Sequence, residues 1–321
     1  MSGDLGDIEA LTCPSAGQEP PSALVTEMMS ALSETPDIRS AGDGASGDLV
    51  NEAMRYSLQL RGKRARGLLV LLIAHGWGKP WQMAIDCAQA VEMVHTSSLI
   101  IDDLPVMDDA NTRRGEPTNH VKYGEPTAVL AGVALLSESL RYVASSAHLS
   151  AEQRNQAVNC LASAIGPTGM SAGQMRDISP PESSLANVEL THALKTGTLF
   201  AAAAELGCIA SGVDGPRKWM LSDFGMLLGK AFQEFDDLID VSTAAESAGK
   251  DTEKDTGKPT VVGILGREAA MSRALRQIST ALECLEASRI ETDELRSYTL
   301  ELTRAMRKMI GPDQPMSNGE A

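Results

Sequence analysis

The sequence feature that most restricts the fold is an apolar, helix-patterned segment that ends in a dense cluster of carboxylates. Apolar residues recur at helical spacing from Trp81 to Asp103, and aspartates then fill four of the eight positions 102–109. Carboxylates at the end of a buried helix repel one another and lose hydration unless a cation lies between them. The segment therefore predicts either a solvated acidic helix end or a site for a hard, oxygen-seeking ion such as magnesium.

The spacing in this first acidic cluster requires a break in the helix. Asp102 and Asp108 are six residues apart, about 240° around an ideal α-helix, so a continuous helix would point them in different directions. Pro105 lies between them and supplies the break. Arg113 and Arg114 follow, and the guanidinium fork matches phosphate oxygens.

A second acidic cluster lies inside another predicted helix, more than a hundred residues later. Asp236 and Asp240 are separated by one helical turn, and Gln233 falls on the same face. Like charges at this spacing destabilise an isolated helix, so this cluster also favours a bound cation. One such cluster is weak evidence, whereas two clusters on apolar helices are difficult to explain as solvated surface.

Basic residues in three further segments complete the pattern. These are Lys63, Arg64 and Arg66 before an apolar helix, Lys195 within the segment 191–206, and Lys250, Lys254 and Lys258 in a Gly/Thr-rich loop. Each basic run alone is more typical of a solvated surface. Lys195 is different, because a charge in an apolar segment is costly without a partner.

Composition and periodicity predict an all-α protein. Aromatic residues make up only 3% of the chain, whereas strands draw on aromatic and β-branched residues. We expect helices over about 22–34, 49–60, 68–73, 81–103, 127–146, 151–165, 169–178, 185–210, 216–241, 267–288 and 294–309, with a loop at 119–126. We expect one domain over 47–310, a flexible segment at 1–46 containing the first short helix, and a polar tail at 311–321.

Charge and cysteine usage narrow the class of protein. A net charge of −15 argues against general nucleic-acid binding. The five cysteines are widely spaced without a CxxC, and no HxxxH or HExxH occurs, so disulfides and zinc are not expected. The start has no basic signal-peptide region, and no uninterrupted apolar run reaches membrane-spanning length. We expect a cytoplasmic protein without a membrane span.

With these residues assembled, the chain resembles the trans-isoprenyl diphosphate synthases, or polyprenyl synthetase family, over about 49–308. The segments that carry the resemblance are DDLPVMD with RRG, FQEFDDLID, GKRAR and GKDTEKDTGKPT. The stretch 91–132 is most similar to bacterial geranylgeranyl diphosphate synthases. The resemblance implies a single-domain helical bundle around a central cavity, usually in a homodimer. It also implies magnesium-dependent condensation of isopentenyl diphosphate with an allylic diphosphate.

The resemblance also implies roles for individual residues. Of three magnesium ions, two would be held by Asp102 and Asp108 with support from Asp103. The third would be held by Asp236, with Asp240 acting through water. The allylic diphosphate would be bound by Arg113, Lys195, Lys250 and Lys258, and isopentenyl diphosphate by Gly62, Lys63, Arg66, His95 and Arg114. Lys195, Thr196 and Gln233 would act in catalysis, the last two through their side-chain oxygens. Arg61, Gly67 and Glu234 depart from the family pattern, and Glu234 would add an acid beside the metal site.

Residues before the first acidic cluster bear on product length. Ser97 and Ser98 are the fifth and fourth residues before Asp102, where fifteen-carbon synthases of the family tend to carry a bulky aromatic at the fifth position. Serine leaves room for another isoprene unit, with Met93 and Val94 as a deeper floor. We therefore expect geranylgeranyl diphosphate, with farnesyl diphosphate as the alternative; Ser97 could instead face a neighbouring helix without influence.

Two further functions stay open at this level. A terpene cyclase also uses an aspartate-rich motif and magnesium, but its second metal motif usually mixes Asn/Asp, Ser/Thr and Glu, and the cluster at Lys63–Arg66 would be unexplained. A non-catalytic partner subunit or an acidic helical scaffold is the other alternative. Such proteins usually lose metal-binding aspartates, and both sets are intact in this chain.

Overall fold

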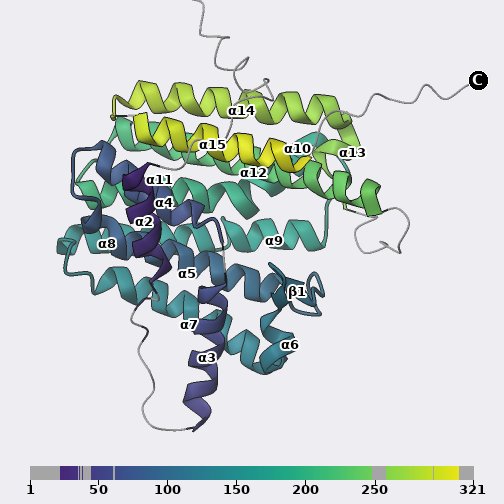
Figure 1. Ribbon diagram of the computed structural model, residues 1–321, viewed down its shortest axis with the longest axis horizontal. Helices are drawn as coiled ribbons and strands as arrows, with labels where there is room; N and C mark the ends of the chain where they lie inside the picture. The colour runs from purple at the N-terminus through teal and green to yellow at the C-terminus, as the bar shows by residue number, and fades with distance from the viewer. Residues whose placement is uncertain are drawn as a thin grey trace, which may run out of the picture.

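The protein is a bundle of helices, as expected from the sequence (Figure 1). The structure is a computed structural model that describes residues 22–34, 36, 38, 45–60, 62–247, 258–291 and 293–310. The α-helices are α2 Ala23–Ser33, α3 Ala45–Gln59, α4 Ala65–Gly76, α5 Ile85–Asp102, α6 Asn119–Tyr123, α7 Glu125–Ala144, α8 Ala151–Ile165, α9 Met170–Ile178, α10 Leu185–His192, α11 Thr198–Ser211, α12 Pro216–Ser247, α13 Val261–Leu265, α14 Arg267–Ser288 and α15 Asp293–Ile310. The remaining elements are the 3₁₀ turn η1 Trp81–Ala84, the π-helix η2 Ala193–Gly197, and the strands β1 Thr112–Arg113 and β2 Glu116–Pro117.

Helix α11 occupies the centre of the bundle and packs against α4, α5 and α12. Its alanines and its one glycine allow this close approach, because a Cβ at Gly207 would lie 2.8 Å from Ile73 Cβ. Leu199 and Phe200 are fully buried among these helices. A second, smaller core lies between α3, α5 and α7. In Figure 1, α14 and α15 cover one side of the bundle, and α3 and α6 lie at the opposite side, beyond α5 and α7.

Three short elements differ from the expectation. The segment 119–126, expected to be a loop, contains α6 and the start of α7. The strands β1 and β2, which were not expected, form an antiparallel hairpin. The short helix α13, also not expected, follows Lys258. Helical periodicity cannot reveal elements of two to five residues, because they are shorter than the repeat that would identify them. The basic segment also joins a helix earlier than expected, since α4 begins at Ala65.

Two helical segments are long and apolar enough to cross a membrane by length and composition, Glu125–Ala144 and Leu185–Ser211. Neither segment is an uninterrupted apolar run, and the core helix of a soluble protein meets the same criterion. The second segment is a core element, with 67% of its most apolar window buried, whereas 33% of the α7 window is buried. The outer face of α7 exposes Val129, Leu130 and Val133.

Candidate active site

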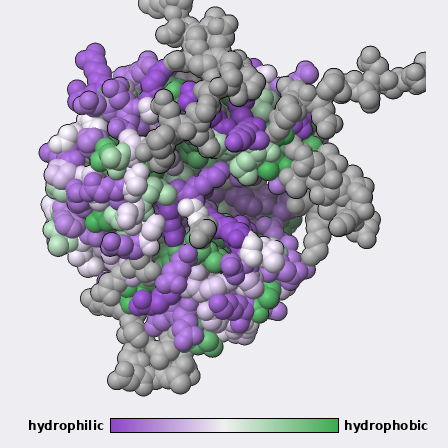
Figure 2. Space-filling view, in the orientation of Figure 1, coloured by the Kyte–Doolittle hydropathy of each residue, from purple (hydrophilic) through white to green (hydrophobic). Residues whose placement is uncertain are grey.

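A cavity of about 890 Å³ lies between α4, α5, α9, η2 and α12. Figure 2, drawn in the orientation of Figure 1, shows a hollow with hydrophilic walls near the middle of the face that is turned to the viewer. Most residues singled out from the sequence line this cavity, although they come from distant segments. They are Gly62, Lys63, Arg66, Val94, His95, Ser97, Ser98, Asp102, Arg113, Arg114, Lys195, Thr196, Gln233 and Asp236.

The first acidic cluster is folded back on the end of α5. The helix ends at Asp102, and the amide of Asp108 donates to the Asp102 carbonyl over 2.9 Å. The helix therefore breaks between the two aspartates, as their spacing required. Burial raises the pKa of Asp102 to about 6, and the nearby carboxylate of Asp108 adds to the rise.

The β1–β2 hairpin carries the two arginines. Its turn residues Arg114 and Gly115 have φ angles of 56° and 84°, the positive values of a tight hairpin turn that suits glycine at the second position. Arg113 Nε donates to both carboxylate oxygens of Asp103 at 2.9 Å, and Nη2 lies 2.6 Å from Oδ1. Asp103 is buried and does not line the cavity. Asp103 holds Arg113 at the cavity wall, and its expected metal-supporting role stays a prediction.

Asp177 is a site residue that the sequence reasoning missed. Its Oδ2 lies 2.7 Å from Lys195 Nζ and 3.2 Å from Lys258 Nζ, and Lys258 Nζ lies 3.1 Å from Asp108 Oδ1. Burial alone would raise the pKa of Asp177, but the two ammonium groups outweigh it and hold this pKa below its usual value. The carboxylate thus joins lysines from two segments to the first acidic cluster.

The π-helix η2 places Lys195 and Thr196 in the cavity wall. It lies between α10 and α11 within one helical run, and wider π turns inside α-helices are frequent at functional sites. Glycines let the neighbouring helices approach it closely. A Cβ at Gly173 of α9 would collide with the Lys195 backbone, and one at Gly229 of α12 would lie 2.8 Å from Gly197 Cα.

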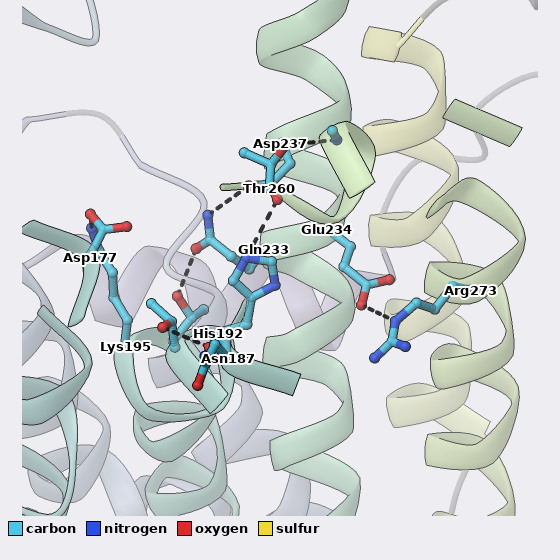
Figure 3. Close-up of polar contacts among 12 residues, drawn as sticks. Asp177, Asn187, His192, Lys195, Gln233, Glu234, Asp237, Thr260 and Arg273 are labelled. Atoms are coloured by element: carbon cyan, nitrogen blue, oxygen red, sulfur yellow. Dashed lines mark hydrogen bonds and ion pairs between the residues drawn. The ribbon is translucent and has the colours of Figure 1, made fainter. Parts of the chain in front are cut away.

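The second acidic cluster lies on the unbroken helix α12. Asp236 is open to the cavity, and desolvation, followed by repulsion from Asp240, raises its pKa to about 6. Asp237 points elsewhere and is 8% exposed. Glu234 also points away from the cavity, to Arg273 Nε at 2.7 Å and to Gln277 Nε2 at 2.9 Å (Figure 3). The expectation that Glu234 adds an acid beside the metal site is therefore wrong.

A chain of polar contacts fixes the orientation of Gln233 (Figure 3). Thr196 Oγ1 donates to Gln233 Oε1 over 2.8 Å, and Gln233 Nε2 donates to Asp237 Oδ1 over 3.4 Å. His192 Nε2 lies 3.4 Å from Asp237 Oδ2. Desolvation, the largest cause, lowers the pKa of His192 to about 4, so its ring is neutral near pH 7. Both ends of the Gln233 amide are engaged within the protein.

A basic end of the cavity, defined here as Gly62, Lys63, Arg66, His95 and Arg114, gathers cationic and neutral donors. The guanidinium of Arg66 lies 4.4 Å from the Phe200 ring centroid, and burial lowers its pKa to about 10. Burial first, then Arg66 and Arg114, hold the pKa of His95 well below its usual value. Glu92, which the sequence reasoning missed, accepts from the Gly67 amide over 2.8 Å and so fixes the first turn of α4.

The acidic end, defined here as Asp102, Asp108, Asp177 and Asp236 with Lys195 and Lys258, includes cavity-lining residues and their ion-pair partners. Asp236 also lies near Lys63 and Arg66 of the basic end, whose charges oppose the rise of its pKa. Carboxylate oxygens are the ligands that magnesium prefers. Burial and then repulsion from other carboxylates raise the pKa values of Asp102 and Asp236, a condition that a bound cation would relieve. No three candidate metal ligands converge on one point within the described residues. This fits an ion that completes its coordination shell with water and substrate phosphates.

Residues before Asp102 reach the apolar part of the cavity. Ser97 is fully buried, and its Oγ donates to the Gly132 carbonyl of α7 over 2.8 Å while it also lines the cavity. Val94 and Ser98 line the cavity too. Met93 does not, which corrects its expected place in the floor: it packs in the second core with Met54 and Leu135. Leu136, Ile165 and Met170 supply apolar wall in its place.

Three residues from the sequence analysis, Arg61, Lys250 and Lys254, lie outside the described residues. Asp240 lies on α12 and, like Asp103, Asp108 and Lys258, is not part of the cavity lining. Asp108 and Lys258 still reach the acidic end through the ion pairs above.

Known proteins are similar to this chain over most of its length. Geranylgeranyl diphosphate synthase of Pantoea ananas is 42% identical over 246 residues, which are 75% of this chain and 80% of that protein. Geranylgeranyl pyrophosphate synthase 3, chloroplastic, of Arabidopsis thaliana is 44% identical over 228 residues, 68% of this chain and 63% of that protein.

Solved structures agree. An FPP/GFPP synthase of Zymomonas mobilis superposes with a TM-score of 0.77 at 30% identity, covering 87% of this chain and 98% of that one. A geranyltransferase of Helicobacter pylori complexed with magnesium and isoprenyl diphosphate superposes with a TM-score of 0.73 at 27% identity. The superposition covers 92% of this chain and 99% of that one. The family model described as polyprenyl synthetase matches residues 47–297. The chain belongs to the polyprenyl synthetase family.

Proposed function

We propose that this protein is a magnesium-dependent prenyltransferase that condenses isopentenyl diphosphate with allylic diphosphates to form geranylgeranyl diphosphate. The observation that carries the proposal is one cavity whose wall holds cationic side chains, aspartates and apolar side chains together. Relatives named geranylgeranyl diphosphate synthase support the product. A terpene cyclase has no use for the basic end, and a non-catalytic subunit has no use for both acidic clusters.

The two substrates would occupy the two ends of the cavity. Lys63, Arg66 and Arg114 would bind the diphosphate of isopentenyl diphosphate, with His95 as a neutral donor. Arg113, Lys195 and Lys258 would bind the allylic diphosphate, with Lys250 as the sequence resemblance implies. Asp103 and Asp177 position Arg113 and the two lysines, respectively.

Asp102, Asp108 and Asp236 would hold magnesium, with Asp240 acting through water and three ions in all. When bound, magnesium supplies Lewis-acid neutralisation of the diphosphate that leaves. Lys195 and Arg113 add fixed positive charge at the same end. The acidic end thus supports the departure of diphosphate.

The reaction breaks the allylic C–O bond, and its electron pair leaves with the diphosphate. The Thr196 hydroxyl donates a hydrogen bond to Gln233. The lone pairs of the Thr196 oxygen are therefore available to the allylic cation in the cavity. The double bond of isopentenyl diphosphate attacks this cation and forms the new C–C bond. A proton then leaves the isopentenyl unit, with the departed diphosphate as acceptor, to give a product five carbons longer.

The product would extend along α5 past Ser97 towards Leu136, Ile165 and Met170. A tyrosine at position 97 would fill the space between α5 and α7, since Ser97 already contacts Gly132. Ser97→Tyr should shift products from twenty to fifteen carbons, measured by chromatography of the dephosphorylated prenols. An unchanged product profile would remove Ser97 as a determinant of chain length.

We also propose a cytoplasmic homodimer. The apolar outer face of α7, with Val129, Leu130 and Val133, supports a second copy as its cover. Exposed apolar side chains gathered on one helix are a feature of subunit interfaces as well as of membrane segments. Sedimentation in the absence of detergent distinguishes a subunit interface from a membrane segment. A protein with a covered subunit interface stays in solution as a dimer, whereas one with an exposed membrane segment would aggregate.

The activity is tested by incubating the purified protein with labelled isopentenyl diphosphate, magnesium and dimethylallyl, geranyl or farnesyl diphosphate in turn. Elongation to a twenty-carbon product is expected. Elongation that stops at fifteen carbons would support the farnesyl diphosphate alternative, and cyclised hydrocarbon without use of isopentenyl diphosphate would support a cyclase. No product with any primer would reject the enzyme.

A further inference from the structure

Gln174 of α9 has a buried amide that the mechanism above does not use. It lines the cavity, yet both Nε2 and Oε1 are shielded from solvent and lack a hydrogen-bond partner. An unpaired buried amide is destabilising, because it loses its hydrogen bonds to water without replacement. A group kept in this condition is expected to find its partner in a bound ligand.

The position of Gln174 indicates which part of the ligand it meets. Asp177, one helical turn further along α9, holds Lys195 and Lys258 at the diphosphate-binding acidic end. Met170, one turn before Gln174, belongs to the apolar wall. Gly173 sets α9 directly against the Lys195 backbone. Gln174 therefore lies at the junction between the diphosphate and the hydrocarbon, where the allylic C–O bond breaks.

A second glutamine in the cavity provides the contrast. The Gln233 amide is engaged at both ends, accepting from Thr196 and donating to Asp237. The Gln174 amide has neither contact. Of the two side chains, Gln174 is the one whose dipole can turn towards the substrate without breaking a protein hydrogen bond.

We propose, on the basis of the prenyltransferase function above, that Gln174 is a further catalytic residue, whose amide oxygen faces the allylic cation while its NH₂ group faces the departing diphosphate. As the C–O bond breaks, its electron pair goes to the diphosphate oxygen and positive charge develops on the allyl group. A fixed amide dipole between these two charges stabilises both. It interacts more strongly with the separated charges than with the intact substrate, so it acts on the rate.

The kinetic test compares Gln174→Met with wild type under the conditions that establish elongation. Methionine keeps the length of the side chain and removes the dipole. We expect kcat to fall about 10- to 100-fold while KM for each substrate stays within about three-fold. Gln156→Met is the matched control, because Gln156 of α8 lies outside the cavity lining and donates to Glu152 over 3.1 Å; its kcat should equal wild type.

A binding test detects the cation contact without turnover. Geranylamine, protonated at neutral pH, is titrated calorimetrically in the presence of inorganic diphosphate, with neutral geraniol as its uncharged counterpart. Gln174→Met should weaken geranylamine binding about 10-fold and leave geraniol binding unchanged. Equal losses for both ligands would show a packing role and overturn the proposal.

Thermal unfolding separates this role from a structural one. An unpaired buried amide replaced by methionine should leave Tm unchanged or raise it, whereas a structural glutamine would lower Tm. A Gln174→Met variant that does not fold would indicate a structural role. In that case Gln174→Asn, which withdraws the amide by one methylene, is measured instead. The proposal then stands only if Gln174→Asn shows the same loss of kcat. Wild type without elongation would reject the prenyltransferase function; elongation with kcat of Gln174→Met within about three-fold of wild type would reject only the role of Gln174.

Discussion

The basic end and the acidic end of the cavity carry opposite electrostatic imbalances. At the basic end, burial and neighbouring cations lower the pKa values of Arg66 and His95. At the acidic end, burial and neighbouring carboxylates raise the pKa values of Asp102 and Asp236 to about 6, while the lysines are already paired with Asp177 and Asp108. The basic end is therefore prepared for an anion, whereas the acidic end requires added cations before it can hold a diphosphate.

Loss of an acidic-end carboxylate should have the largest effect. Asp102→Ala removes a proposed magnesium ligand, and we expect kcat/KM to fall about 10³-fold or more. The measurement is steady-state elongation at saturating magnesium. Asp223→Ala, on an exposed part of α12, is the control. A fall of less than about ten-fold for Asp102→Ala would contradict the division of the cavity into two ends.

Loss of a basic-end cation should act mainly on one substrate. Arg66→Met removes a charge and keeps an apolar chain against Phe200; we expect KM for isopentenyl diphosphate to rise about 30-fold. KM for the allylic substrate should change much less. Equal increases for both substrates would mean that the two ends are not separate sites.

Removal of magnesium should affect the two ends unequally. Chelation should weaken binding of a non-hydrolysable allylic diphosphate analogue about 10-fold or more, since the acidic end then repels it. Binding of isopentenyl diphosphate alone should change less than about three-fold, because the basic end needs no metal. Calorimetry with and without magnesium measures both, and parallel losses would refute the difference.

A smaller effect should appear in the pH dependence of stability. The folded-state pKa of His95 lies below 6.5, so the unfolded chain binds a proton first as pH falls, and stability present above that pH is lost below it. Relative to His95→Gln, wild type should lose about 2 kcal/mol of unfolding free energy between about pH 7.5 and 5. Urea titration at both values measures it.

Carboxyl groups at the acidic end act in the opposite direction, because their raised pKa values make the folded state bind protons first. Asp102→Asn should therefore remove a gain in stability at low pH, rather than a loss. If His95→Gln and Asp102→Asn changed the pH dependence of the unfolding free energy in the same direction, the electrostatic difference between the two ends would be contradicted.

The fold and most of the cavity lining follow from patterns that extend over many residues. Apolar periodicity identified the long helices, and the aspartate spacing identified the helix break after Asp102. The family resemblance placed Asp102 and Asp236 on one cavity. Asp177 and Gln174 escaped because their significance depends on α9 packing against Lys195, a long-range contact that local pattern does not contain. Met93 and Glu234 were misplaced because neither residue type nor spacing specifies which side of a buried helix faces the cavity.

The π-helix η2 has a consequence for how this chain tolerates change. A π turn is an α-helix with one residue too many, so the helix after Gly197 is rotated by about 100° from the position that an uninterrupted α-helix would give it. The extra residue lets Lys195 and Thr196 face the cavity while α11 keeps the orientation that suits the core. Deleting a single residue between 193 and 197 would force one of these two registers to give way.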